Sequence, residues 1–197
     1  MTGVQTCALP IYPKYSGKLH SKSEPDVTPD DGNRGSLAPH AASILMKLLY
    51  AARIARFDLL RSINMLARNV NKWTSNDDAR LHHLMCYVNS TLDKRMIGWV
   101  GDPIATLSVG IFADADFAGC GETLRSTSGS HMHVQGKHTR FPIAGGSKRQ
   151  GCISHSTPEA EIVAADSALR NFGIPSIGLW QTLTGKAPEI LLMIIKV

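Results

Sequence analysis

The hydrophobic periodicity of this chain changes once, near Gly98, and that change limits the folds it can adopt. Upstream of this glycine, apolar residues recur at spacings of three and four, which is typical of one buried helix face. Downstream, short apolar runs with β-branched residues are separated by turn signals, which is typical of strands. The sequence therefore predicts a small helical segment over residues 40–98 and an α/β domain over residues 99–197.

Three helices are expected within residues 40–92, because each stretch has its own apolar face. The second helix is expected to open at Phe57 and Asp58, and Thr74 stands where the third needs an N-cap. The three faces are Ile44, Leu45, Leu48 and Leu49; Leu60, Ile63, Leu66 and Val70; and Leu81, Leu84, Met85 and Val88. Amphipathic faces of this kind predict that the helices pack together.

The second half of the chain predicts several strands, a helix and a returning strand. Leu107–Phe112 is an apolar run that suits a buried strand ending at Asp114. Thr157 and Pro158 begin a helix that runs to about Leu169, because proline is tolerated at the first helical position. The remaining expected elements are strands at 130–135, 139–143, 152–155 and 190–197 and a short helix at 179–183. Antiparallel strands, a crossover helix and a returning strand predict a mixed α/β sheet.

Composition sets broad limits on the compartment and the partners. The net charge is +5 and the pI is about 9.1, a mild basic excess that favours polyanions. The four cysteines form no C-x-x-C pair, so reduced thiols in the cytoplasm or nucleus are expected. No apolar run reaches the roughly 18 residues of a membrane span, so no membrane partner is expected.

The first 39 residues are expected to be a disordered lead-in. They are rich in Pro, Ser, Asp and Gly, and such a segment buries too little apolar surface to offset its ordering entropy. Residues 2–11 (TGVQTCALPI) resemble the translation of a sequencing adapter, so residues 1–11 are expected to be an artefact rather than protein.

Two acidic clusters stand where chemistry is plausible. Asp114 and Asp116 follow a buried strand, and carboxylates at such a strand end require cations or solvent. Ser156 and Glu159 have the spacing of a capping box at the start of a helix. Residues two apart point about 200° apart on a helix, so Glu161 is left free to face the sheet.

Four motifs in order resemble the copia-type retrotransposon ribonuclease H. That family reads approximately S-D-A-D-W-A-G, R-x-S-T-S-G, S-x-K-Q and S-T-x-E-A-E-Y. The matching segments are FADADFAG (112–119), RSTSG (125–129), SKRQ (147–150) and HSTPEAE (155–161). Upstream, KLLYAARIARFDL (47–59) resembles the end of the family's reverse transcriptase. The resemblance covers about residues 40–197 and implies a ribonuclease H-like mixed sheet with packing helices.

The resemblance also implies an activity, which is metal-dependent hydrolysis of the RNA strand in RNA–DNA hybrids. It implies that Asp114 and Glu161 are catalytic and hold a two-ion site for Mg²⁺ (or Mn²⁺), with Asp116 as a further metal ligand. The implied partners are the RNA–DNA hybrid and the remainder of the retrotransposon polyprotein. The implied location is cytoplasmic or nuclear, within a virus-like particle.

Basic and hydroxyl residues inside the matching motifs are expected to contact nucleic acid, because such groups commonly meet phosphate oxygens. They are Arg125, Ser126, Ser128, Lys148 and Arg149. The alternative for the first three is a turn that opens the next strand, and for the last two a solvated hairpin.

The sequence also departs from the family. The family's third carboxylate follows an apolar strand, and residues 190–197 (ILLMIIKV) end where it would stand; the fourth is missing too. A site with two carboxylates should bind metal poorly, so this fragment is expected not to cleave a hybrid. The polymerase carboxylates are also absent, so polymerisation is not expected.

Three other functions fit parts of the sequence. A haloacid-dehalogenase-like phosphohydrolase would use Asp114 as its nucleophile, although Ala118 stands where that family has Thr or Val. A non-catalytic nucleic-acid-binding module would need only the basic balance. A zinc-binding module would draw its ligands from His131, His133, His138, Cys152 and His155.

Overall fold

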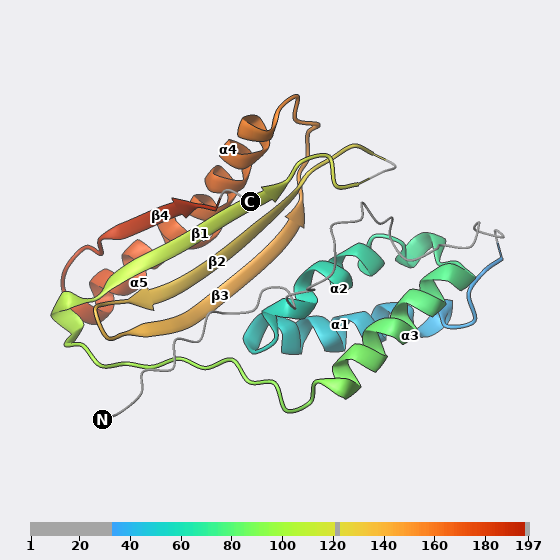
Figure 1. Ribbon diagram of the computed structural model, residues 1–197, viewed down its shortest axis with the longest axis horizontal. Coiled ribbons are helices and arrows are strands. Elements are labelled where there is room, and N and C mark those ends of the chain that lie inside the picture. The colour runs from blue at the N-terminus through green and yellow to red at the C-terminus, as the bar shows by residue number, and fades with distance from the viewer. Residues whose placement is uncertain (1–32, 121–122, 196–197) are drawn as a thin grey trace, which may run out of the picture.

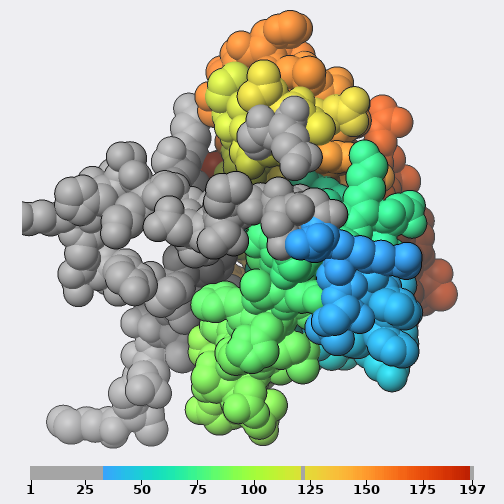
Figure 2. All heavy atoms as spheres, turned by 90° about the vertical axis from the view of Figure 1, so that its right-hand side faces the viewer, coloured from blue at the N-terminus to red at the C-terminus, as the bar shows by residue number. Residues whose placement is uncertain are grey.

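The computed structural model describes residues 33–120 and 123–195, which form a helical body beside an α/β layer (Figure 1). Of the lead-in predicted at residues 1–39, residues 1–32 lie outside the described residues, and α1 begins before its end, at Ala38. The helical body consists of α1 (Ala38–Ile54), α2 (Leu60–Ala67) and α3 (Ser75–Ser90), with 3₁₀ turns at Phe57–Leu59 and Val70–Lys72. Figure 2 shows the helical body, blue to green, next to the yellow-to-red mass of the second half of the chain.

The α/β layer is a mixed sheet, as the sequence predicts. Its strands are β1 (Ser108–Asp116), β2 (Thr127–Gln135), β3 (Arg140–Arg149) and β4 (Ile190–Ile194), in the order β3-β2-β1-β4. β1, β2 and β3 are antiparallel neighbours, whereas β4 is parallel to β1. A parallel return needs a crossover, which α4 (Thr157–Ala168), a π turn at Leu169–Gly173 and α5 (Ile174–Thr184) supply.

The three helices bury their predicted apolar faces against one another. Leu45 and Ile63 are fully buried and Leu81 is 1% exposed, so one residue from each helix meets in the same core. Burial of each such side chain stabilises the fold by about 2 kcal/mol. Thr74 caps α3 as predicted, in a capping box with Asp77.

Asp78 fastens the start of α1 to α3. Its carboxylate accepts hydrogen bonds from the Ser36 backbone N–H (2.6 Å), the Leu37 backbone N–H (3.2 Å) and the Nε1–H of buried Trp73 (2.6 Å). Burial alone would raise the pKa of Asp78, but these hydrogen bonds outweigh it and lower the pKa.

We expect Asp78→Ala to lower the free energy of unfolding by about 2 kcal/mol, because four donors, the Ser36 hydroxyl included, lose their acceptor and the Trp73 indole is buried. Urea denaturation followed by circular dichroism measures the change. Asp93→Ala is the matched control, since Asp93 is exposed and also loses one carboxylate. Equal stabilities of the two variants would contradict this role for Asp78.

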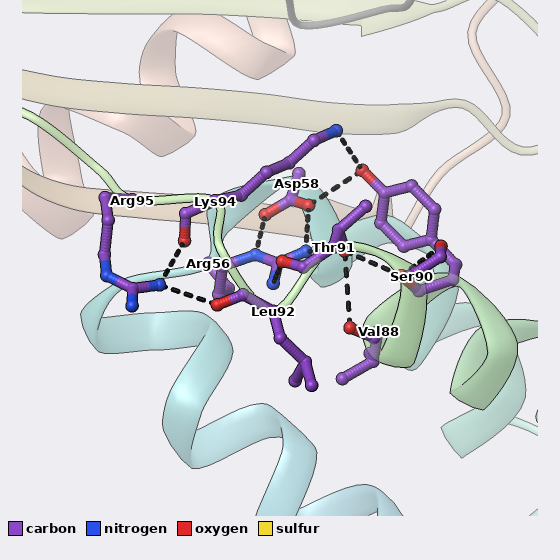
Figure 3. A network of polar contacts seen from close by, with 9 residues as sticks. Arg56, Asp58, Val88, Ser90, Thr91, Leu92, Lys94 and Arg95 are labelled. Carbon is purple, nitrogen blue, oxygen red and sulfur yellow. Dashed lines mark hydrogen bonds and ion pairs between the residues drawn. The ribbon is translucent and has the colours of Figure 1, made fainter.

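A polar network fixes the chain as it leaves α3 (Figure 3). Arg56 pairs with Asp58 at 2.8 Å and donates to the Thr91 carbonyl at 3.0 Å, and the Tyr87 hydroxyl also donates to Asp58 at 3.0 Å. These bonds tie the turn between α1 and α2 to the end of α3. The segment that leads from α3 to β1 is therefore held to the helical body where it begins, at Thr91.

One face of the sheet packs on α4. Ile111 is fully buried, Val109 and Ala113 are nearly so, and all three belong to the apolar cluster that includes Ala165 and Ala168 of α4. Side chains alternate along a strand, so the residues between them on β1 point to the opposite face.

The opposite face meets the helical body through aromatic rings. Phe57 contacts His131 edge-on at 5.7 Å between centroids, and the Phe112 ring stacks on His133 at 5.0 Å. Burial, followed by the charge of His133, lowers the pKa of His131 to about 4. This interface therefore requires neutral histidines.

Several predicted boundaries were wrong in an instructive way. β1 continues two residues beyond Asp114, because its pairing with β2 runs on to Asp116 and Thr127. The strand predicted at 152–155 is a bend instead, held where the Ser154 hydroxyl donates to Gln150 at 3.1 Å. The short helix predicted at 179–183 is part of the longer α5, because the chain passes through Gly173 in a π turn without leaving the helix.

Candidate active site at one end of the sheet

Asp114 lies near the carboxyl end of β1, opposite Gly129 of β2. Strand alternation places its side chain on the same face as Phe112, the face that meets the helical body. β4 ends at Ile194, and the last described contact along this edge is the Ile195 N–H bonded to the Ala113 carbonyl at 3.0 Å. Among the described residues, the β4-side edge of β1 is therefore open from Asp114 onward.

Glu161 reaches the same strand end from α4. Ser156 caps the helix by accepting a hydrogen bond from the Glu159 N–H at 3.3 Å, and the Glu159 carboxylate turns back to the His155 N–H at 2.7 Å. With Glu159 used at the helix start, Glu161 is free to face the sheet, as predicted. It is half-buried, and its Oε2 is buried without a hydrogen-bond partner among the described residues.

The charge of Asp114 acts electrostatically on Glu161. The pKa of Glu161 is raised, first by burial and then by the negative charge of Asp114, while a hydrogen bond from the Ala115 backbone acts in the opposite direction. The two carboxylates are therefore close enough at the end of β1 for the charge of one to act on the other. A pair of like charges, one of them short of partners, can be relieved by a proton or by a cation.

Gln150 holds the helix start against the strands, a role the sequence did not reveal. Its buried side-chain amide donates to the Ser128 hydroxyl at 3.0 Å and to the Ala160 carbonyl at 2.9 Å. The clamp therefore spans β2 and the residue directly before Glu161. The sequence marks this role only in that Gln150 is the last residue of the SKRQ motif.

Asp116, the further metal ligand that the resemblance implies, has two partners within the described residues. Its carboxylate pairs with Arg61 of α2 at 3.0 Å and accepts a hydrogen bond from the Thr127 N–H. Within the described ranges, no three His, Cys, Asp or Glu side chains gather closely enough to hold a metal ion. Asp116 is thus already neutralised by an arginine, and its role as a metal ligand stays a prediction.

The five predicted nucleic-acid contacts separate into two kinds. Ser126 is fully buried and its hydroxyl accepts from the Ala118 N–H at 3.1 Å, while buried Ser128 is bonded to Gln150. Both hydroxyls are therefore engaged inside the protein and are not exposed to a ligand. Lys148 is exposed, and Arg125 and Arg149 are half-buried.

The zinc alternative finds no support in the described residues. His131 and His133 do project from one face of β2, but their rings stack at 5.6 Å beside Phe112 instead of converging on a point. His138, Cys152 and His155 are exposed, and residues 33–120 and 123–195 contain no group of three side chains that could hold a metal ion.

No protein-family model, curated protein or solved structure matches this chain. Within residues 33–120 and 123–195, no helix combines the length and apolar character needed to cross a bilayer. The residues that bear on function are therefore those at the carboxyl end of β1.

Proposed function

We propose that this chain is a piece of a copia-type retrotransposon polyprotein whose ribonuclease H-like layer presents Asp114 and Glu161 as metal ligands. The observation that carries the proposal is Glu161, a half-buried helix carboxylate that faces the carboxyl end of β1. Its pKa is raised first by burial and then by the Asp114 charge. Its substrate class is the RNA strand of an RNA–DNA hybrid.

The position of the four motifs supports this proposal. Residues 112–119 end β1 and residues 125–129 open β2, while 147–150 close β3 and 155–161 begin α4. Strand pairing of Gly129 with both Asp114 and Ser147, together with the Gln150 clamp on Ala160, brings all four to one end of the sheet. Segments that are far apart in sequence share one location, as parts of one site would.

The chemistry of the donor set also fits. Carboxylate oxygens are the ligands that Mg²⁺ and Mn²⁺ prefer, and a divalent cation would relieve the repulsion between Asp114 and Glu161. When bound, such ions activate water and stabilise the leaving oxygen of a phosphodiester. The protein's own part is to hold the two carboxylates, Asp114 from β1 and Glu161 from the clamped start of α4.

The helical body corresponds in this proposal to the end of the reverse transcriptase. The remainder of the polyprotein and the hybrid are the proposed partners, in a cytoplasmic or nuclear particle. A site of two carboxylates is expected to bind metal weakly and not to cleave the hybrid, so metal binding rather than turnover is the property to assay in this chain.

We expect Asp114→Asn to lower the pKa of Glu161 and to weaken Mn²⁺ binding, because one of the two causes of the raised pKa and one ligand are removed together. Carboxyl-carbon NMR of labelled glutamate measures the pKa, and titration of the Mn²⁺ paramagnetic signal measures binding. Glu161→Gln should weaken Mn²⁺ binding as well.

Asp166→Asn is the matched control, since Asp166 is an exposed carboxylate on the same helix and pairs only with Arg170 among the described residues. It should leave both readings unchanged. The proposal fails if Asp114→Asn leaves the Glu161 pKa where it was, or if Mn²⁺ binding is insensitive to both site variants.

A further inference from the structure

Three arginines lie near one another where α2 meets the end of the sheet. Arg61 lies in α2, Arg68 is the C-cap of that helix, and Arg149 is the last residue of β3. The register pairs Asp116 with Thr127 and Thr127 with Arg149. The side chains of Asp116, Thr127 and Arg149 therefore form a row across the three strands, on one face of the sheet. This is the face that α2 approaches.

Two contacts place α2 against that row. Arg61 Nη2 lies 3.0 Å from Asp116 Oδ2, and Asn64 Nδ2 donates to the Ser147 carbonyl at 2.8 Å. The guanidinium of Arg68 is brought near the other two: its pKa is lowered, first by burial and then by the charges of Arg149 and Arg61, with Asp116 acting in the opposite direction.

The cluster is short of negative charge and of acceptors. Asp116 is the one carboxylate that pairs with any of the three guanidiniums among the described residues, and it is bonded to Arg61. Arg68 and Arg149 are both half-buried, yet neither donates a side-chain hydrogen bond or forms an ion pair within the part of the chain that the structure describes. Partly buried guanidinium donors without acceptors are costly, and an anion would remove that cost.

We propose that Arg61, Arg68 and Arg149 bind a backbone phosphate of the nucleic acid, next to the carboxylate pair. The planar fork of a guanidinium matches phosphate oxygens in two-point contact, and such charge-assisted hydrogen bonds are the strong ones. The helical body thereby contributes two of the three contacts to a site at the end of the sheet.

The position favours a nucleic-acid phosphate over a small free anion. Asp116 is two residues beyond Asp114 on β1, about 7 Å along an extended strand, so a chain passing Asp114 and Glu161 also reaches the arginines. Arg61 is 51% exposed, which leaves the cluster open to a polymer that enters and leaves. In this step the inference rests on the proposed function.

The test is binding of a labelled RNA–DNA hybrid to the full chain at several salt concentrations, without divalent metal. Arg68→Gln and Arg149→Gln should each weaken binding about tenfold and reduce the slope of log affinity against log salt by about one. Arg170→Gln is the matched control: Arg170 is 73% exposed and follows α4 at the opposite end of the sheet, so it should bind like the unaltered chain. Arg68→Lys should keep the salt slope but lose affinity, because the charge remains and the fork is lost.

Because metal is absent, a failure of the carboxylate site cannot alter these results, and Asp114→Asn should not abolish arginine-dependent binding. Loss of repulsion should leave the arginine variants folded, which thermal denaturation checks. Arginine variants that bind the hybrid as Arg170→Gln does would overturn the proposal. A chain that binds inorganic phosphate through these arginines but no hybrid at low salt would also overturn it.

Discussion

Ile111→Ala is expected to lower the free energy of unfolding by about 4 kcal/mol, because it opens a cavity where a fully buried side chain holds β1 to α4. Ile111 lies in the middle of β1, beside Met132 on β2 and Leu192 on β4. Little freedom exists for the neighbours to fill the space, since strands flank it on both sides. Urea denaturation followed by circular dichroism measures the loss.

The Ile111→Ala substitution should also change the pKa of Glu161. Glu161 owes its raised pKa to burial against β1, and a looser contact between α4 and the strand should let that pKa fall toward its ordinary value. Ile162→Ala removes the same atoms from an α4 side chain that is 65% exposed, and should change stability by less than about 1 kcal/mol. A comparable loss in both variants would mean that the packing of α4 on β1 is not as described.

Acid should weaken the contact between the helical body and the sheet. The pKa of His131 is about 4 in the folded chain and near 6.5 when unfolded, so between these values the unfolded chain binds the extra proton. This contribution to stability is intact above pH 6.5 and is lost as the pH falls toward 4, in total about 3 kcal/mol.

His131→Phe should flatten the stability profile in that window, because phenylalanine keeps a ring between Phe57 and Phe112 but takes up no proton. Denaturation at a series of pH values, compared with the unaltered chain, gives the difference. His83→Phe is the control, since His83 is exposed on α3 and should leave the profile unchanged. A His131→Phe profile as steep as that of the unaltered chain would assign the acid sensitivity to other groups.

Local patterns in the sequence were sufficient for most of the architecture. The buried run before Asp114, the Ser156 cap and the Thr157–Pro158 helix start are short-range signals, and each led to the element that the structure shows. The orientation of Glu161 followed from helix geometry alone, because Glu159 occupies the helix start. The predicted mixed α/β layer is therefore confirmed, while its ribonuclease H-like character remains our proposal.

Tertiary contacts account for what the sequence did not reveal. Nothing near Arg61 or Arg68 marks them as neighbours of β1, since the residues that bring them there are 50 or more positions away. The sequence does not reveal that α2 supplies an arginine to Asp116, or that the Ser126 and Ser128 hydroxyls are buried. Such assignments depend on which surfaces meet.

The contact between Phe57 and His131, together with the Arg61–Asp116 ion pair, limits where two chains could be joined in a chimera. A chimera that kept the sheet and exchanged the helices would expose Phe112 and His131 to water and would strip Asp116 of its counter-ion. A crossover in the linker near Gly98, which would join the helices of one chain to the sheet of another, should therefore destabilise the fold unless these contacting residues are exchanged together.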